Sequence, residues 1–353
     1  GILDSSTTFI EYFEGEKAIY AFVITKQDVS VEVIVKDEGL QFKLQNFQKS
    51  LMDHDNYAKQ TAVVYNTFIQ DAHYFYQKLV QGAITKNKTA RLIIVPDGVL
   101  SYLPFEVLLQ KTTPLLKQGA NVGVDFSNLP YLVRDYKISY NYSGTILMAQ
   151  QAKPKNSING NILALAPYYT SSKAPPNWRE KRILKLRNLL VDLSGTVNEV
   201  TNLENCYEGQ FYFGQQANET IFKKAAYNYG ILHLAMHGFV DQNNPDYSAL
   251  ILAEDQAKEE DNILYSYEIK QLELQTNLVV LSACETGIGK YQRGEGVVSI
   301  GRSFMYAGVP SLLMTLWSLN DHSGTVIIEQ FYKNLSIGME KDEAIRQAKL
   351  FYL

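Results

Sequence analysis

Cysteine is scarce in this sequence, and its scarcity excludes a fold held together by several disulfide bonds. Only Cys206 and Cys284 occur among the 353 residues. Two cysteines cannot form the framework of disulfides that small secreted domains use, so a reducing compartment is the simpler interpretation. We therefore expect a cytoplasmic protein.

Long apolar runs and an excess of positive charge are also missing. No stretch approaches the roughly 18 apolar residues that span a bilayer, and no signal peptide opens the chain. The formal net charge of −4 argues against a general nucleic-acid binder, which would be basic. We expect neither a membrane nor a directly bound nucleic acid as a partner.

Three common loop motifs are absent or incomplete. Gly287-Ile-Gly-Lys290 is not a phosphate-binding loop, because Cys284 stands where the motif needs an earlier glycine and Tyr291 where it needs Ser or Thr. Gly294-Glu-Gly296 lacks the third glycine of a dinucleotide fingerprint, since Ser299 occupies that place. No Gly-x-Ser-x-Gly elbow occurs. We therefore expect no cofactor.

The first part of the chain has the pattern of an α+β domain. Runs rich in aromatic and β-branched residues, separated by short polar turns, predict an antiparallel meander over 8–13, 18–25 and 29–35. Apolar residues spaced three and four apart predict a long helix from Tyr65 to Leu79. A helix is also expected to open near 103–106, where a proline stands close to the first position.

A polar segment at 150–160, with proline and glycine, predicts a boundary between domains. We expect a non-catalytic α+β domain at 1–150 and a second domain at 160–353. In the second, short apolar strands alternate with helices, which argues for a mostly parallel sheet covered on both faces. The strands are expected at 161–166, 210–213, 230–237, 247–252, 277–284 and 311–317, and the helices at 194–207, 217–229, 297–307, 323–335 and 341–353.

His237 and Cys284 each end one of these apolar runs, so two strands would deliver an imidazole and a thiol to the same edge of the sheet. A thiol needs a nearby base or a lowered pKa to act as a nucleophile. These two residues therefore form a candidate catalytic dyad. Gly238 lets a substrate backbone approach closely, and the backbone N–H groups of Gly238 and Cys284 are the candidate oxyanion donors.

Simpler interpretations compete with the dyad. A cysteine that ends an apolar strand is often a small buried hydrophobe, and a histidine is often a core or surface group. His233 and His237 lie four residues apart and could bind zinc if the segment were helical. The apolar run around them favours a strand, so we expect a core histidine at 233, with a supporting role as the minor alternative, and no metal.

Several stretches of the sequence resemble the CHAT family, whose caspase-like cysteine peptidase domains are related to separases and caspases. The resemblance rests on His-Gly and Ala-Cys blocks that follow apolar runs, and on further motifs before and after them. These stretches are 96–100, 103–105, 231–238, 278–287, 294–296, 302–308, 316–321, 331–332 and 344–353.

The resemblance implies a caspase-like, mostly parallel α/β sheet flanked by helices, preceded by an α+β companion domain of pseudo-protease type. It implies a cysteine endopeptidase that cleaves proteins or peptides, with His237 and Cys284 as its catalytic residues. A regulatory partner or fused tetratricopeptide repeats are also expected, as in bacterial members, because Gly1 is not an initiator methionine and the chain is taken as part of a longer protein.

Two other functions stay open: a silent caspase-like scaffold that binds partners, and acyl transfer or hydrolysis on non-peptide carbonyls. A basic residue before the scissile bond would need an acidic pocket. Carboxylates in the right neighbourhood, which are equally explained as solvated loop residues, are Asp241, Asp246, Glu285, Glu295 and Asp321. Asp321 could instead cap the helix that follows.

Overall fold

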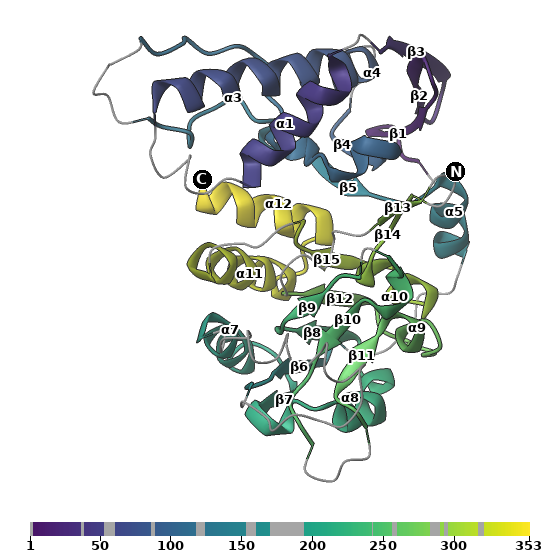
Figure 1. Ribbon diagram of the computed structural model, residues 1–353, viewed down its shortest axis with the longest axis vertical. Coiled ribbons are helices and arrows are strands. Elements are labelled where there is room, and N and C mark those ends of the chain that lie inside the picture. The colour runs from purple at the N-terminus through teal and green to yellow at the C-terminus, as the bar shows by residue number, and fades with distance from the viewer. Residues whose placement is uncertain are drawn as a thin grey trace. The chain divides into compact units, whose positions relative to one another are not determined.

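The chain forms two compact units in a computed structural model (Figure 1). The first comprises Gly1–Pro154 together with Gly338–Leu353, and the second comprises Lys155–Ile337. That 1–150 and 160–353 are two separate domains stays a prediction. The structure describes residues 3–36, 39–52, 61–85, 89–117, 124–152, 160–169, 194–241, 243–255, 260–282, 290–292, 296–316 and 321–353.

A five-stranded mixed sheet forms the centre of the first unit, in the order β3-β2-β1-β4-β5. The first three strands pair antiparallel, as the meander predicted, and β4 and β5 continue the sheet in parallel. Burial alternates along β2, and the buried face of the sheet includes the fully buried Ile10 of β1, Ile19 of β2 and Leu92 of β4. The strands are β1 Thr7–Glu14, β2 Ala18–Ile24, β3 Val29–Val35, β4 Arg91–Val95 and β5 Lys137–Tyr140.

The helix predicted from Tyr65 to Leu79 is confirmed, but its last part is wider than an α-helix. It starts after Thr61, whose side chain accepts a hydrogen bond from the N–H of Val64, and it continues as a π-helix over Tyr76–Gln81. Phe68 and Phe75 on its apolar stripe are buried against Phe47. The α-helices of this unit are α1 Leu40–Met52, α3 Ala62–Phe75, α4 Gly82–Ile84, α5 Gly144–Ala152 and α12 Lys341–Tyr352.

The helix expected to open near 103–106 is confirmed only as a short 3-10 helix, Phe105–Val107, which begins directly after Pro104. Another 3-10 helix, Gly98–Tyr102, precedes it, and Leu103 and Pro104 between the two are extended. The proline accounts for the extended Leu103, because the residue that precedes a proline avoids the helical region of backbone space.

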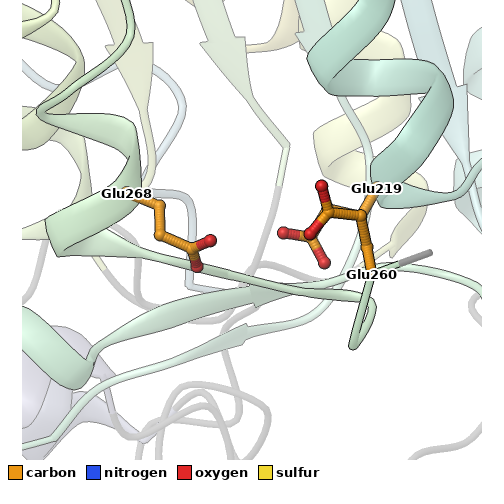
Figure 2. A group of neighbouring side chains, drawn as sticks. All are labelled: Glu219, Glu260 and Glu268. Atoms are coloured by element: carbon orange, nitrogen blue, oxygen red, sulfur yellow. The ribbon is translucent and has the colours of Figure 1, made fainter.

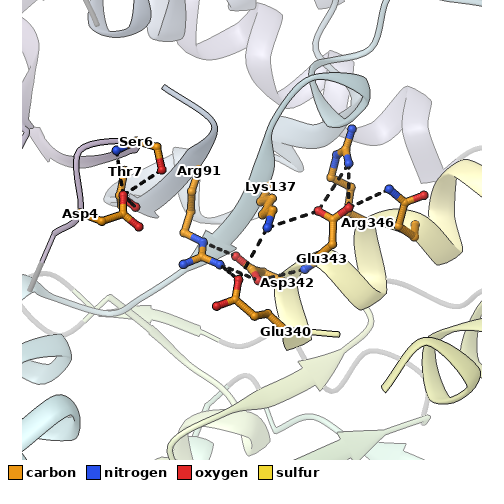
Figure 3. Close-up of polar contacts among 10 residues, drawn as sticks. Asp4, Ser6, Thr7, Arg91, Lys137, Glu340, Asp342, Glu343 and Arg346 are labelled. Carbon is orange, nitrogen blue, oxygen red and sulfur yellow. Dashed lines mark hydrogen bonds and ion pairs between the residues drawn. The ribbon is translucent and has the colours of Figure 1, made fainter. Parts of the chain in front are cut away.

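The final helix α12 belongs to the first unit through a set of ion pairs (Figure 3). The Nε atom of Arg91 on β4 lies 2.6 Å from Oδ2 of Asp342, and a second guanidinium nitrogen of Arg91 contacts Glu340. Farther along the helix, Arg346 donates to the carbonyl of Val133 at 2.8 Å. Arg91 of the sheet thus meets two acidic groups at the start of α12, where the helix dipole favours negative charge.

A five-stranded, wholly parallel sheet forms the centre of the second unit, in the order β15-β12-β8-β6-β7, with helices on both faces (Figure 1). This confirms the predicted α/β architecture of caspase-like type. Leu163, Leu232 and Val279 share one core cluster with Phe222 and Phe304 of the helices on that face. The strands are β6 Ile162–Ala166, β7 Gly209–Phe213, β8 Ile231–Leu234, β12 Leu278–Leu281 and β15 Leu312–Met314.

The helices of the second unit begin and end largely as the sequence predicts. Asn218 caps the predicted helix by accepting from the N–H of Ile221 at 2.9 Å, and Gly308 follows its helix at a φ of 105°. Both observations confirm the expected termini. The α-helices are α7 Ser194–Glu204, α8 Glu219–Ala225, α9 Ser266–Ile269, α10 Ile300–Tyr306 and α11 Asp321–Ser336.

Two small antiparallel sheets complete this unit. One has the order β11-β10-β9, and the other pairs β13 with β14. The strand expected over 230–237 is shorter than predicted, since β8 ends at Leu234 and a new strand begins at Gly238. The strands are β9 Gly238–Phe239, β10 Ala249–Ile251, β11 Ile263–Tyr265, β13 Lys290–Gln292 and β14 Gly296–Val298. None of the helices in the described parts of the chain has the length and apolar character to cross a membrane.

Candidate active site

His237 lies between the central parallel sheet and the small sheet, three residues after the end of β8. The residue is half-buried, and its carbonyl accepts a hydrogen bond from the N–H of Ile251 on β10 at 2.9 Å. The ring of Tyr169 lies against the imidazole, with 5.0 Å between ring centroids. The backbone and the ring of His237 are therefore each held by a separate neighbour.

The Tyr169 hydroxyl also takes part in the β9–β10 ladder. It accepts a hydrogen bond from the N–H of His237 at 3.0 Å and donates one to the carbonyl of Ile251 at 2.9 Å. An antiparallel pair normally exchanges two direct N–H···O bonds between facing residues. Here one bond between His237 and Ile251 is direct, and the phenol oxygen bridges the other.

Gly238 presents its backbone N–H away from β10. Gly238 lies opposite Leu250, next to the hydrogen-bonded pair formed by His237 and Ile251. Residues of an antiparallel strand alternate between pointing their N–H toward the partner strand and away from it. Because no other described strand pairs with β9, the N–H of Gly238 points away from the small sheet.

Of the other residues singled out in the sequence, Cys284, Glu285 and Glu295 lie outside the described residues. The strand that precedes Cys284 is described: β12 pairs in parallel with β8, and Leu281 lies opposite Leu234. Asp321 is the first residue of α11, so it lies inside the helix and not at the preceding position, where a capping residue stands.

Asp241 has a structural task in the loop that follows β9. Its side chain is buried, and its Oδ1 accepts hydrogen bonds from the N–H groups of Asn243 at 2.9 Å and Asn244 at 3.0 Å. The carboxylate therefore shapes its own turn, and a role in a substrate pocket stays a prediction. The side chain of Asp246 is exposed and pairs with Lys270.

His233 is a core residue, as the sequence favoured, and it lies in a buried polar network. Its Nδ1 lies 3.0 Å from the hydroxyl of Tyr332 on α11. Its Nε2 lies 3.1 Å from Oε1 of Glu199 on α7, without the alignment of a hydrogen bond. The other oxygen of Glu199 accepts from the hydroxyl of Ser282, 2.9 Å away, directly after β12. The strand conformation of β8 removes the helical geometry that the zinc alternative needed.

Three glutamates form the group that comes closest to a metal site in the described parts of the chain (Figure 2). Oxygen atoms of Glu219, Glu260 and Glu268 lie within 4.8 Å of one another. The ammonium of Lys223 lies among them, at 2.8 Å, 3.0 Å and 2.9 Å respectively. Two of the carboxylates also accept backbone N–H groups, Glu219 from Ile263 and Glu268 from Tyr265. The cluster is thus an ion-pair network around a lysine.

Sequence reasoning missed Tyr169, Glu199 and Tyr332. Tyr169 follows the predicted strand 161–166 by three residues, the same offset that His237 has from β8. Polar residues that follow parallel strands at the same distance meet at one edge of the sheet, so this offset was an available signal. Glu199 gave none, because a single glutamate within a helix is normally on the solvent face.

The family comparison agrees with this architecture. The CHAT domain model matches residues 65–353, and no curated protein matches the chain. The match covers most of the first unit and the whole of the second, including both neighbouring strands that precede His237 and Cys284. The chain therefore belongs to the CHAT family.

Proposed function

We propose that this chain is a cysteine endopeptidase in which His237 and Cys284 form the catalytic dyad. The observation that carries the proposal is the register of two neighbouring parallel strands. Leu234 on β8 lies opposite Leu281 on β12, and His237 and Cys284 each follow these paired leucines by three residues. Adjacent strands lie about 4.8 Å apart, so an equal offset supports two side chains within reach of one substrate bond.

The reaction would proceed through a thioester. His237 accepts the proton of the Cys284 thiol, and the sulfur attacks the carbonyl carbon of the scissile peptide bond. The C–N bond breaks, and the imidazolium returns its proton to the leaving amine. Water then attacks the thioester while His237 accepts a proton from it. The C–S bond breaks, the carboxylic acid leaves, and the thiol regains its proton.

The backbone around His237 supports oxyanion stabilisation. By the ladder alternation, the N–H of Gly238 points to the side of β9 on which no described strand pairs, and the absence of a side chain lets a carbonyl approach closely. We assign the oxyanion to this N–H together with that of Cys284. Donors of this kind typically contribute about 100-fold or more to the rate.

Covalent labelling tests the proposal without knowledge of the natural substrate. The probe is a panel of peptidyl acyloxymethyl ketones that differ in the side chain before the reactive carbon, read out by intact mass and peptide mapping. We expect label on Cys284 and none on Cys206, which is exposed and serves as an internal control. His237→Ala should slow labelling by about 100-fold or more, whereas Cys206→Ala should not change it.

Two results would contradict the proposal. Labelling that Cys284→Ala leaves unchanged would exclude the thiol mechanism. A complete lack of labelling across the panel, also with binding partners added, would favour the silent scaffold. Acyl transfer to non-peptide substrates would show as thioester turnover with small acyl donors and no cleavage of peptides. Cys284→Ala is a suitable control because cysteine-to-alanine changes usually cost little stability.

A further inference from the structure

We propose that Tyr169 is a positioning residue for His237, an inference that rests on the proposed function. Its hydroxyl sets the backbone of His237 and Gly238, and its ring sets the imidazole. Neither the sequence motifs nor the family match assigns a role to this residue.

The first argument is the geometry of the bridged ladder bond. The phenol oxygen lies 3.0 Å from the N–H of His237 and 2.9 Å from the carbonyl of Ile251. Both distances are those of ordinary hydrogen bonds. Because an oxygen atom stands between the two backbone groups, they are farther apart than in a direct N–H···O bond. The hydroxyl therefore holds His237 away from β10 on one side, while the direct bond from Ile251 N–H holds it close on the other.

The second argument is that removal of the hydroxyl leaves the backbone of His237 no equivalent arrangement. Without the oxygen, the N–H of His237 and the carbonyl of Ile251 either lose this shared partner or move together and form a direct hydrogen bond with each other. Loss of a partner in a sparsely solvated place is costly. Closing up would move the backbone of His237, and with it the N–H of Gly238. Either outcome disturbs the two groups that the reaction uses.

The third argument is that Tyr169 is itself anchored. Its ring packs against the apolar cluster of the small sheet, which includes Ala249, Ile251 and Ile263. The same ring lies 5.0 Å from the imidazole, tilted by 54°. A ring that is held on one side by a packed sheet limits the rotamers open to a histidine on the other. Phenylalanine at this position would keep the ring and remove only the bridge.

The experiment compares Tyr169→Phe with Tyr168→Phe in a Cys206→Ser background, which leaves Cys284 as the single thiol. Tyr168 is the neighbouring residue and is exposed, so its variant is a matched control. Two readouts are used. One is the rate of labelling at Cys284 by the best acyloxymethyl ketone of the panel, separated into a binding constant and a maximal rate. The other is the backbone amide spectrum of protein labelled with ¹⁵N-histidine. The protein contains five histidines, so the spectrum has few signals to assign.

We expect Tyr169→Phe to lower the maximal labelling rate by about 10-fold or more, since small misplacements of catalytic groups are expensive, with little change in the binding constant. The His237 amide signal, assigned with His237→Gln, should shift, while those of the other histidines stay in place. Tyr168→Phe should change neither readout. An unchanged rate for Tyr169→Phe would overturn the inference, whether or not the amide signal moves.

The two proposals fail in different ways. Failure of the peptidase proposal would leave Cys284 unlabelled in the wild-type background, while the His237 amide signal still shifts in Tyr169→Phe. That result would overturn the catalytic part of the inference and confirm the structural contact. Normal labelling of the wild-type, with an unchanged rate and an unchanged His237 signal in Tyr169→Phe, would overturn the inference alone.

Discussion

The Nδ1 atom of His233 lies 3.0 Å from the hydroxyl oxygen of Tyr332, and both side chains are fully buried. Burial, reinforced by the nearby Glu199 carboxylate, holds the pKa of the Tyr332 hydroxyl well above its usual value, so this hydroxyl keeps its proton. Glu199 lies on the other side of the imidazole. The polar groups of this core therefore depend on one another for partners.

Tyr332→Phe should destabilise the protein by about 1–3 kcal/mol, because it leaves Nδ1 of His233 buried without its partner. The measurement is urea unfolding followed by circular dichroism. Tyr306→Phe is the control, since the Tyr306 side chain is 59% exposed and its hydroxyl is accessible to water. A Tyr332→Phe variant as stable as the control would show that the contact contributes nothing.

Lys223→Met should cost about 3 kcal/mol, the scale on which a buried ion pair loses one partner. It leaves three clustered carboxylates without their cation, and Glu219 among them is fully buried. Lys333→Met is the matched control: Lys333 also pairs with a glutamate four residues away, but its side chain is 53% exposed. Exposed pairs contribute about 0.5 kcal/mol, so similar losses in chemical unfolding for the two variants would contradict the ion-pair interpretation.

We expect the Glu106 carboxylate to make the folded protein less stable in acid. Burial acts to raise the pKa of this carboxyl group, but the Lys349 ammonium at 2.8 Å and the Tyr140 hydroxyl outweigh burial and hold the pKa below its ordinary value of 4.5. A carboxylate with a lowered folded-state pKa stabilises the fold above the unfolded-state pKa. That contribution is lost as the pH falls through the folded-state value.

Urea unfolding at about pH 6 and about pH 3.5 tests this sign. The wild-type protein should lose more stability between the two conditions than Glu106→Gln, which has no proton to take up at this site. Glu16→Gln is the control, because the Glu16 side chain is exposed. An acid loss as large in Glu106→Gln as in the wild-type would disprove the assignment to Glu106.

Gly98→Ala should destabilise the first unit by about 2 kcal/mol or more. Gly98 has a φ of +58°, where a side chain is strained. A Cβ atom there would lie 1.5 Å from a carboxylate oxygen of Glu14, which accepts from the N–H of Val99. Gly160→Ala is the control, since no atom of the described residues beyond its chain neighbours lies within 4 Å of its Cβ position. Equal thermal stability of the two variants would refute the steric argument.

The sequence predicted the strands well because their signals are local. The apolar strands Ile162–Ala166 and Leu278–Leu281 are buried along their whole length in a parallel sheet, and continuous apolar runs are the sequence signal of such strands. The exact ends of the strands were harder to predict from the sequence. The apolar run through Met236 continues past Leu234, where β8 stops, since Ala235 and Met236 are also buried and Ala235 still donates its N–H to the carbonyl of Leu165 on β6 at 3.0 Å.

Contacts between distant residues account for most of what the sequence did not reveal. Tyr169 and Ile251 are 82 positions apart, and His233 and Tyr332 are 99 apart, so no spacing rule connects them. The widening of the long helix at Tyr76–Gln81 has no marker among its own residues, although Tyr12 of β1 donates a hydrogen bond to the carbonyl of Leu79 there. Leu103 is different, because the proline after it is visible in the sequence and predicts its extended backbone.

The place of α12 gives the chain an inserted topology: the first unit is built from both ends, and the second is spliced into it between Pro154 and Gly338. Cleavage of the chain at only one of these junctions would not release the second unit by itself. The fragment that contains the second unit would still carry a segment of the first unit. Clean excision requires two cuts, and it leaves α12 on a fragment of its own, held to β4 by Arg91 and its acidic partners.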